Sequence, residues 1–218
     1  MNLQLALDRM SREDCFQAIE DTKESIDWIE VGTGVIKEYG MEIVREIKKA
    51  FPHKTLVADM KTCDAGKHEA VQAFEAGADI TTVMSFSADQ TIKDTLKVAE
   101  DFHGRIMIDL LGVKDEARIR ELSDIGVDLV SLHFGKDMQE TGEMQEEDLF
   151  TLVKHYPHLQ VAVAGGINLG SLPSILDHRP DTLIVGSGIT KSSDRQDTAV
   201  KMKGMITNYE ANDSNRQR

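Results

Sequence analysis

The chain has 218 residues, 40% of them hydrophobic and 29% charged, which suits a globular protein with the length of a single α/β barrel. Its formal net charge of −13 argues against binding to nucleic acid or to an anionic membrane. If so acidic a chain binds a phosphate, we expect the contacts to be local, through backbone N–H groups, a helix N-terminus or a metal ion.

Short β-like runs alternate with helical patterns from residue 3 to residue 209. We expect strands at residues 3–8, 26–33, 55–61, 79–85, 105–112, 128–135, 159–166 and 182–188. The helical patterns that follow these runs end near residues 23, 50, 76, 102, 125, 155, 176 and 209. This alternation predicts right-handed βαβ units and a parallel sheet.

The eight similar βα units predict a single (β/α)8 TIM barrel of the α/β class over residues 1–209. A doubly wound open sheet is the alternative, but no G-x-G-x-x-G motif follows the first strand. Residues 136–145 form the longest expected loop. We expect residues 210–218 to be a polar, frayed tail.

Cys15 and Cys63 form no spacing pattern, which favours reduced thiols and a cytoplasmic location. The chain shows no basic N-terminal segment and no apolar stretch of about 18 residues, so we expect neither a signal peptide nor a membrane span.

Catalytic groups of barrels of this kind lie at the C-terminal ends of the strands. The polar side chains at the expected strand ends are those of Asp8, Glu30, Asp59, Lys61, Asp64, Asp109 and His133. Asp59 and Lys61 are two residues apart on one strand, so their side chains should point to the same side. A structural ion pair is one interpretation, but several carboxylates around one lysine exceed the need of a single pair.

Glu30 and Asp59 end adjacent expected strands, so their carboxylates could share one cation. Mg²⁺ prefers oxygen ligands and uses one or two protein carboxylates together with water. The sequence therefore predicts a magnesium site at Glu30 and Asp59. His133 ends the sixth strand, where a neutral imidazole suits acid–base chemistry near pH 7, whereas the other histidines fall in helices or connections.

Glycines end the seventh and eighth strands, as Gly165-Gly166 and as Gly186-Ser187-Gly188. Glycine allows backbone N–H groups to approach a phosphate, and barrels often hold phosphate at these two strands. We therefore expect Gly165, Gly166, Gly186 and Ser187 to bind a phosphate.

The segment 59–64 resembles the D-x-K-x-x-D motif of the orotidine 5′-monophosphate decarboxylase superfamily, and the segments 3–8, 29–33, 163–167 and 184–189 extend the resemblance over residues 2–205. Within this superfamily the chain is more similar to the 3-hexulose-6-phosphate synthases and their sister family, the 3-keto-L-gulonate-6-phosphate decarboxylases, than to the orotidylate enzymes.

The resemblance implies a role for each candidate residue. Glu30 and Asp59 would hold Mg²⁺, and Lys61 and Asp8 would orient the substrate and an enediolate intermediate. His133 would handle a proton, and the glycines with Ser187 would hold the phosphate. Asp64 would enter the neighbouring active site of a homodimer with shared sites.

The segment 132–139 decides between the sister families. His133, Phe134 and Gly135 resemble the synthase pattern H-x-G-x-D-x-Q, whereas Lys136 puts a cation where the decarboxylases carry a second arginine. Ala164 also favours the synthases. Gly34 stands where synthases often have proline.

The resemblance thus implies Mg²⁺-dependent aldol condensation of formaldehyde with D-ribulose 5-phosphate, with Lys136 counted among the substrate-binding residues. The alternatives are decarboxylation of 3-keto-L-gulonate 6-phosphate and a non-catalytic barrel that binds sugar phosphates.

Overall fold

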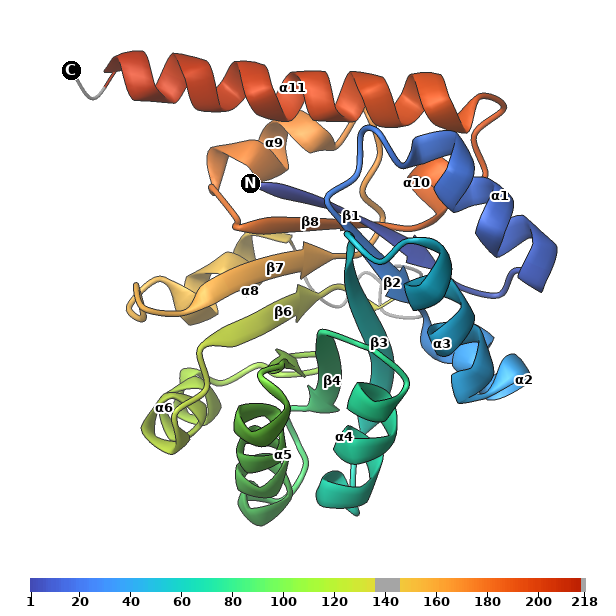
Figure 1. The fold of residues 1–218 in the computed structure, drawn as a ribbon. Coiled ribbons are helices and arrows are strands. Elements are labelled where there is room, and N and C mark those ends of the chain that lie inside the picture. The colour runs from blue at the N-terminus through green and yellow to red at the C-terminus, as the bar shows by residue number, and fades with distance from the viewer. Residues whose placement is uncertain (136–145, 217–218) are drawn as a thin grey trace.

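The computed structural model describes residues 1–135 and 146–216, and its described part contains a closed barrel of eight parallel strands in sequential order (Figure 1). The predicted single TIM barrel is therefore confirmed. The strands are β1 (Asn2–Leu7), β2 (Trp28–Val31), β3 (Thr55–Thr62), β4 (Ile80–Met84), β5 (Arg105–Asp109), β6 (Leu129–His133), β7 (Gln160–Ala164) and β8 (Thr182–Val185).

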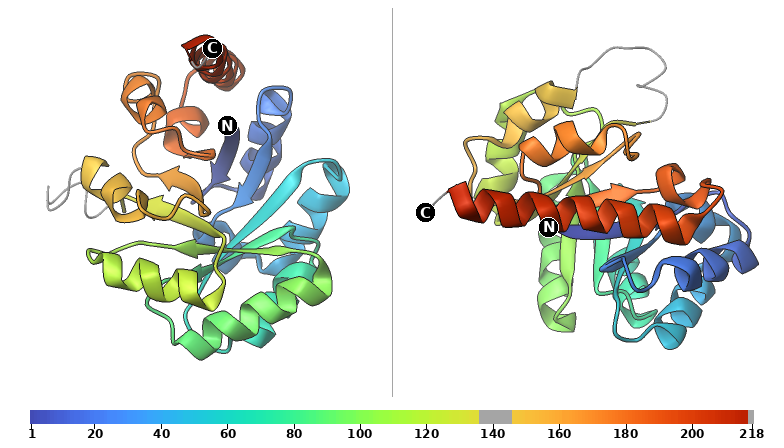
Figure 2. Two further views of the ribbon diagram at one scale, coloured as in Figure 1. Left: turned by 90° about the vertical axis from the view of Figure 1, so that its left-hand side faces the viewer. Right: turned by 90° about the horizontal axis from the view of Figure 1, so that it is seen from above.

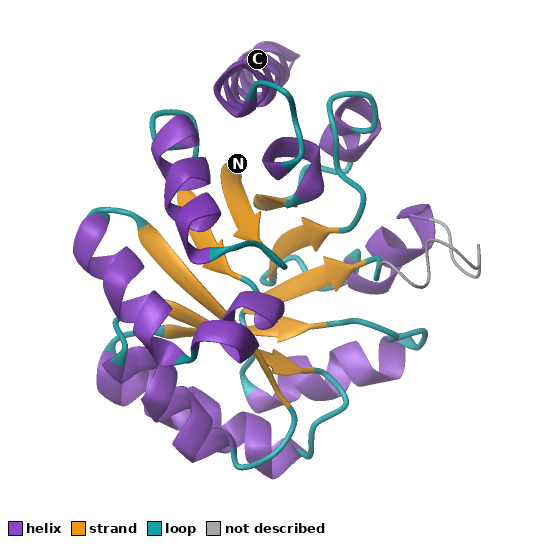
Figure 3. Cartoon of the chain, turned by 90° about the vertical axis from the view of Figure 1, so that its right-hand side faces the viewer, coloured by secondary structure: helices purple, strands orange, loops and turns teal. Residues whose placement is uncertain are grey.

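The helices surround the strands on the outside of the barrel (Figures 2 and 3). They are α1 (Arg12–Thr22), α2 (Thr33–Tyr39), α3 (Met41–Ala50), α4 (Gly66–Glu75), α5 (Asp89–Phe102), α6 (Glu116–Ile125), α8 (Glu146–Val153), α9 (Leu172–Asp177), α10 (Ser187–Thr190) and α11 (Arg195–Arg216). In the described part of the chain, no helix is both long enough and apolar enough to cross a membrane.

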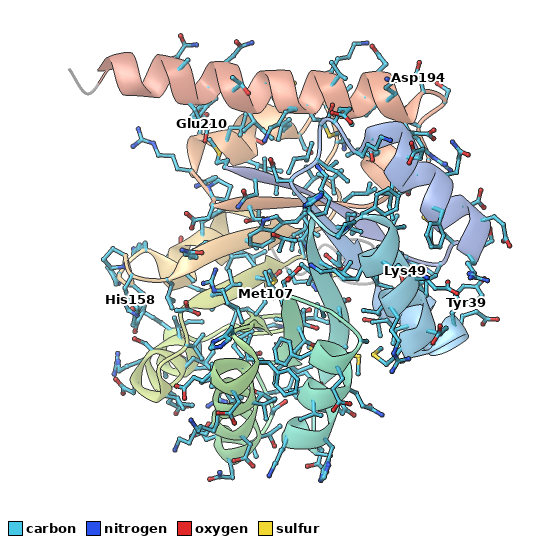
Figure 4. All side chains as sticks on the ribbon, viewed as in Figure 1. Tyr39, Lys49, Met107, His158, Asp194 and Glu210 are labelled. Atoms are coloured by element: carbon cyan, nitrogen blue, oxygen red, sulfur yellow. The ribbon has the colours of Figure 1, made fainter. Side chains whose placement is uncertain are left out.

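Two apolar layers stabilise the barrel. A small inner cluster fills the space between the strands, and Figure 4 labels one of its members, Met107. The larger cluster lies between the strands and the helices. Because alternate strand residues point to opposite faces, Ile80 and Thr82 of β4 face the interior while Thr81 and Val83 face the helices.

The structure divides one predicted helix in two. The single helical stretch expected up to Ala50 is interrupted at Gly40, whose φ of 66° ends α2 before α3 begins. A left-handed residue cannot continue an α-helix, and glycine adopts this conformation without a steric penalty. The last strand is also shorter than expected, because Ser187 and Gly188 belong to the short helix α10.

The expected frayed tail from Glu210 is wrong as far as Arg216. Helix α11 continues through Arg216 and lies along the outside of the barrel beside α1 and α9 (Figures 1 and 2). The sequence after Gly204 contains neither glycine nor proline, so nothing in it ends the helix at Tyr209. Glu210, labelled in Figure 4, pairs with the amino group of Met1.

Candidate active site

A bulge at the end of β3 presents the first two candidate residues. Ala58 pairs with Thr81 and Thr62 pairs with Val83, so three residues of β3, from Asp59 to Lys61, lie opposite the single residue Thr82. Within this bulge Lys61 takes the left-handed conformation, with φ of 48°. The Lys61 ammonium lies 3.3 Å from Asp59 Oδ1, so the expected pair forms, although the backbone between its members is irregular.

Asp59 is buried and held from both sides. The Thr33 hydroxyl lies 2.7 Å from Oδ2, and the Thr82 hydroxyl donates to Oδ1 over 2.8 Å. The Thr33 hydroxyl also lies 2.8 Å from the Asp59 carbonyl oxygen, and it has only one hydrogen to donate. An ionised carboxylate has about four acceptor positions, so these two hydroxyls and Lys61 leave at least one position open. The carboxylate is thus fixed in orientation without being fully occupied.

Asp109 connects Lys61 to His133. Its Oδ2 lies 2.5 Å from Lys61 Nζ and 2.9 Å from His133 Nδ1, while its Oδ1 accepts the backbone N–H of Leu111 over 2.9 Å. Asp109 is 2% exposed, so it is almost inaccessible to solvent. Residues from β3, β5 and β6 therefore form one continuous hydrogen-bonded chain at the C-terminal end of the barrel.

Glu30 lies at the same end, on β2, and accepts a hydrogen bond from the amide of Gln4. Gln4 is completely buried, and its Oε1 atom has no hydrogen-bond partner among the residues that the structure describes. Burial and the negative charge of Asp59 raise the pKa of Glu30 to about 8, against the opposing effects of Gln4 and Lys61. The ionised forms of Glu30 and Asp59 repel each other, and this repulsion is one cause of the raised pKa.

The neighbouring charges decide the protonation of the connected groups. Burial alone would lower the pKa of Lys61, but the charges of Asp59 and Asp109 outweigh it and hold the pKa above its usual range. Burial would likewise raise the pKa of Asp109, but the hydrogen bond and charge of His133, with Lys61, lower it to about 2. Lys61 is consequently a cation and Asp109 an anion at neutral pH.

The donor set suits a hard cation that keeps water. No group of three or more His, Cys, Asp or Glu side chains among the described residues could hold a metal ion. Glu30 and Asp59 are a pair of carboxylates with free acceptor positions and mutual repulsion. Mg²⁺ is typically bound by one or two carboxylates, with substrate and water supplying the other ligands, so this pair fits Mg²⁺.

Asp8 and Asp64 lie outside this hydrogen-bonded chain. Asp8 follows β1 and accepts the N–H of Gly34 over 3.0 Å, and its other oxygen lies 3.0 Å from Arg9 Nε. Proline at position 34 could not donate this hydrogen bond, so Gly34 contributes directly to the placement of Asp8. Asp64 is exposed in the loop between β3 and α4.

The expected phosphate-binding glycines follow β7 and β8. Gly165 has φ of 121°, and a Cβ atom there would lie 2.3 Å from the Phe134 carbonyl oxygen, so only glycine fits. Gly186 precedes α10, and Ser187 is its exposed first residue. The third and fourth amides of this short helix donate to the Gly186 carbonyl oxygen, so an anion would have to bind the first two. Lys136 lies outside the described residues.

The comparisons with known proteins agree with this geometry. Residues 1–202 match the family described as orotidine 5′-phosphate decarboxylase / HUMPS. The chain belongs to this family. The resemblance seen in the segment 59–64 is thereby confirmed.

Three relatives place the chain more closely. It is 41% identical over 207 residues to 3-hexulose-6-phosphate synthase of Bacillus subtilis, which covers 94% of this chain and 99% of the relative. The solved structure of 3-hexulose-6-phosphate synthase from Salmonella typhimurium has a TM-score of 0.92 and 33% identity, covering 96% of this chain and 100% of the other. The structure of 3-keto-L-gulonate-6-phosphate decarboxylase from Vibrio cholerae has a TM-score of 0.83 and 27% identity, covering 95% of this chain and 98% of the other.

Sequence reasoning missed the residues that hold the candidate groups in place. Asp109 was recognised as a strand-end residue, but its spacing gave no role, because its partners are 48 and 24 residues away in the chain. Thr33, Thr82 and Gln4 gave no signal, since such residues are common in strands and helix starts. Their importance follows only from the closed barrel, which brings their elements together.

Proposed function

We propose that the chain catalyses the Mg²⁺-dependent aldol condensation of formaldehyde with D-ribulose 5-phosphate, giving D-arabino-3-hexulose 6-phosphate through an enediolate. The observation that carries this proposal is the connected set Lys61, Asp109 and His133 beside the Glu30–Asp59 pair, in a chain 41% identical to a 3-hexulose-6-phosphate synthase. These groups supply a base, a fixed cation and a candidate metal site, which enediolate chemistry requires.

His133 acts as the base in this proposal. Asp109 is ionised and can accept a hydrogen bond from His133 Nδ1. In the neutral form of the imidazole this arrangement leaves Nε2 unprotonated, so that Nε2 can remove a proton from C1 of the sugar phosphate. Asp109 also stabilises the imidazolium that forms, as the carboxylate of a catalytic triad does. The carbanion equivalent at C1 then attacks formaldehyde, so that a carbon–carbon bond forms as the C=O π bond of formaldehyde breaks. The resulting alkoxide takes the proton back from the His133 imidazolium, which restores the base.

Lys61 provides a fixed positive charge for the oxygens of the enediolate. Its ammonium is held by two carboxylates, so it remains protonated at neutral pH and is a poor nucleophile for a carbonyl group. The proposed mechanism therefore involves no Schiff base. A preorganised charge of this kind costs no reorganisation when the intermediate forms.

Glu30 and Asp59 would hold the Mg²⁺ ion. A bound Mg²⁺ supplies Lewis-acid stabilisation of negative charge on substrate oxygens. Treatment with EDTA should abolish turnover, and added Mg²⁺ should restore it.

The phosphate would be bound through the backbone donors that follow β7 and β8, at Gly165, Gly166, Gly186 and Ser187. This assignment explains how a chain with net charge −13 can bind an anionic substrate.

The deciding experiment supplies purified protein and Mg²⁺ with each substrate separately. We expect loss of D-ribulose 5-phosphate that depends on formaldehyde, and formation of a hexulose phosphate. Release of CO₂ from 3-keto-L-gulonate 6-phosphate without the aldol reaction would instead support the sister activity, which the fold similarity to the Vibrio cholerae decarboxylase makes the second candidate. An inert protein that still binds sugar phosphates would be a non-catalytic barrel.

A homodimer with shared sites is part of the proposal, and the exposure of Asp64 supports it, because this carboxylate is not used in its own subunit's hydrogen-bonded chain. Mixing inactive Asp59→Ala and Asp64→Ala proteins tests the arrangement. Random exchange should restore about a quarter of the wild-type activity, because half of the dimers would be mixed and each would contain one complete site. Absence of any recovery after verified subunit exchange would argue against shared sites.

The proposed reaction takes place in the cytoplasm. The reduced state expected of Cys15 and Cys63 supports this location.

A further inference from the structure

Thr82 occupies the position opposite the bulge in β3. The three residues from Asp59 to Lys61 face this one residue of β4, so the regular ladder is interrupted at the point where the two charged side chains leave the strand. A bulge leaves backbone groups without ladder partners, and a buried N–H group without a partner is costly. The hydroxyl of Thr82 replaces the missing partner.

Two hydrogen bonds of Thr82 run in fixed directions. The backbone N–H of Lys61 donates to Thr82 Oγ1 over 2.9 Å, and the same hydroxyl donates to Asp59 Oδ1 over 2.8 Å. An amide N–H can only donate, so the hydroxyl must accept there and direct its own hydrogen to the carboxylate. One buried side chain, 4% exposed, thereby holds the backbone of Lys61 and the carboxylate of Asp59 together.

The conformation of Lys61 requires such support. Its φ of 48° is unfavourable for a residue with a side chain, and conformations of this kind persist when surrounding contacts fix them. The contact between Lys61 Nζ and Asp109 Oδ2 depends on where this backbone directs the side chain. A shift of the bulge would therefore displace the ammonium from Asp109 and Asp59 at the same time.

We infer that Thr82 is a positioning residue, which sets the relative placement of Asp59 and Lys61 through its single hydroxyl group. The structural part of this inference is independent of the reaction, and its catalytic consequence rests on the proposed function. Thr82 itself acts through the two charged residues.

The neighbouring residue offers a matched control. Thr81 is equally buried on the same strand, but its hydroxyl donates to the Ala58 carbonyl on the opposite face, over 3.1 Å. Thr81→Val and Thr82→Val therefore remove one buried hydroxyl each from adjacent positions. Thr82→Ser keeps the hydroxyl, and Thr82→Ala differs from Thr82→Ser only by its loss, so this pair remains informative if valine at position 82 disturbs folding.

Two measurements test the inference. The first is hydrogen exchange of the Lys61 amide without substrate, which should become at least about tenfold faster in Thr82→Val and Thr82→Ala and remain near wild type in Thr82→Ser and Thr81→Val. The second is formaldehyde-dependent turnover of D-ribulose 5-phosphate with Mg²⁺. There, loss of the hydroxyl should lower kcat by about 10- to 100-fold while KM changes less than about threefold, because misplacement of catalytic groups by about 1 Å has effects of this size.

Three results would contradict the positioning role of Thr82. Unchanged Lys61 exchange in Thr82→Val and Thr82→Ala would overturn the inference, as would Thr82→Ser behaving like Thr82→Ala or Thr81→Val losing as much turnover as Thr82→Val. If the wild type shows no turnover but Lys61 exchange responds as expected, the proposed function fails and the positioning role stands.

Discussion

Replacement of Asp109 by asparagine gives the sharpest test of the site, because the structure fixes how the new amide must lie. The N–H of Leu111 donates to Oδ1, so the oxygen of the asparagine amide takes this position and its NH₂ group takes the position of Oδ2. The NH₂ group then faces the ammonium of Lys61 and Nδ1 of His133. His133 would have to accept at Nδ1 and carry its proton on Nε2, where it cannot act as a base.

The expected losses can be estimated from these contacts. General-base catalysis contributes about 10²- to 10⁴-fold, so kcat of Asp109→Asn should fall at least about 100-fold in the formaldehyde-dependent assay. The pKa of Asp109 falls from the ordinary 3.8 to about 2 in the folded state, and a difference of this size corresponds to roughly 2.5 kcal/mol of stability at neutral pH. Urea denaturation should show a loss of this order at pH 7.

The pH dependence of the stability difference follows from its sign. A carboxylate whose folded pKa is lowered stabilises the fold above its unfolded pKa, and this contribution disappears as the pH falls through about 2. The difference between wild type and Asp109→Asn should therefore be nearly constant from pH 7 to about 5 and be about halved at pH 3. Asp128→Asn removes an exposed partner of Arg105 and serves as the control, with a change below about 1 kcal/mol. Turnover of Asp109→Asn within about threefold of wild type would refute the role given to His133.

Three further predictions concern other parts of the site. Gly165→Ala would place Cβ 2.3 Å from the Phe134 carbonyl oxygen, so the backbone would have to shift. KM for the sugar phosphate should then rise at least about tenfold. An unchanged KM would show that Gly165 does not contribute to phosphate binding. Lys61→Met should abolish turnover, and borohydride treatment of wild type with substrate should leave its mass unchanged, whereas a trapped adduct on Lys61 would contradict the electrostatic role. Gly34→Ala would bring Cβ to 2.5 Å from Asp8 Oδ1 and should raise KM about tenfold; wild-type kinetics would show that the position of Asp8 is unimportant.

The repeating pattern of the sequence was enough to predict the barrel. Alternation of eight apolar runs with helical patterns has few topological solutions, and strand ends in a closed barrel must share one face. The polar side chains at that face, such as those of Glu30, Asp59 and His133, could therefore be selected by position alone. The interruption at Gly40 was missed because glycine inside a helical pattern is often tolerated.

The local geometry of the site could not be predicted in the same way. Period-2 alternation placed Asp59 and Lys61 on one side, but a bulge with Lys61 in a left-handed conformation achieves this contact. The residue types in this segment, which contains no glycine, do not predict a bulge. The hydrogen-bonded chain from Lys61 through Asp109 to His133 depends on the relative placement of three strands. The spacing of these residues along the sequence does not predict that placement.

The seam between β1 and β8 closes the barrel by pairing Asn2 with Thr182, which are far apart in the chain. Gly186 directly follows β8 at this seam and lies against Ala6. A Cβ atom added at Gly186 would be 3.6 Å from the Ala6 carbonyl oxygen. A phosphate bound at Gly186, as proposed, would therefore lie beside β1 and favour the closed form of the barrel. By linkage, a ligand present at about 100 times its Kd would stabilise the closed barrel by about 2.7 kcal/mol. Substrate concentration would then protect the N-terminal strand from local opening and proteolysis, so that occupancy of the site and the lifetime of the folded protein rise together.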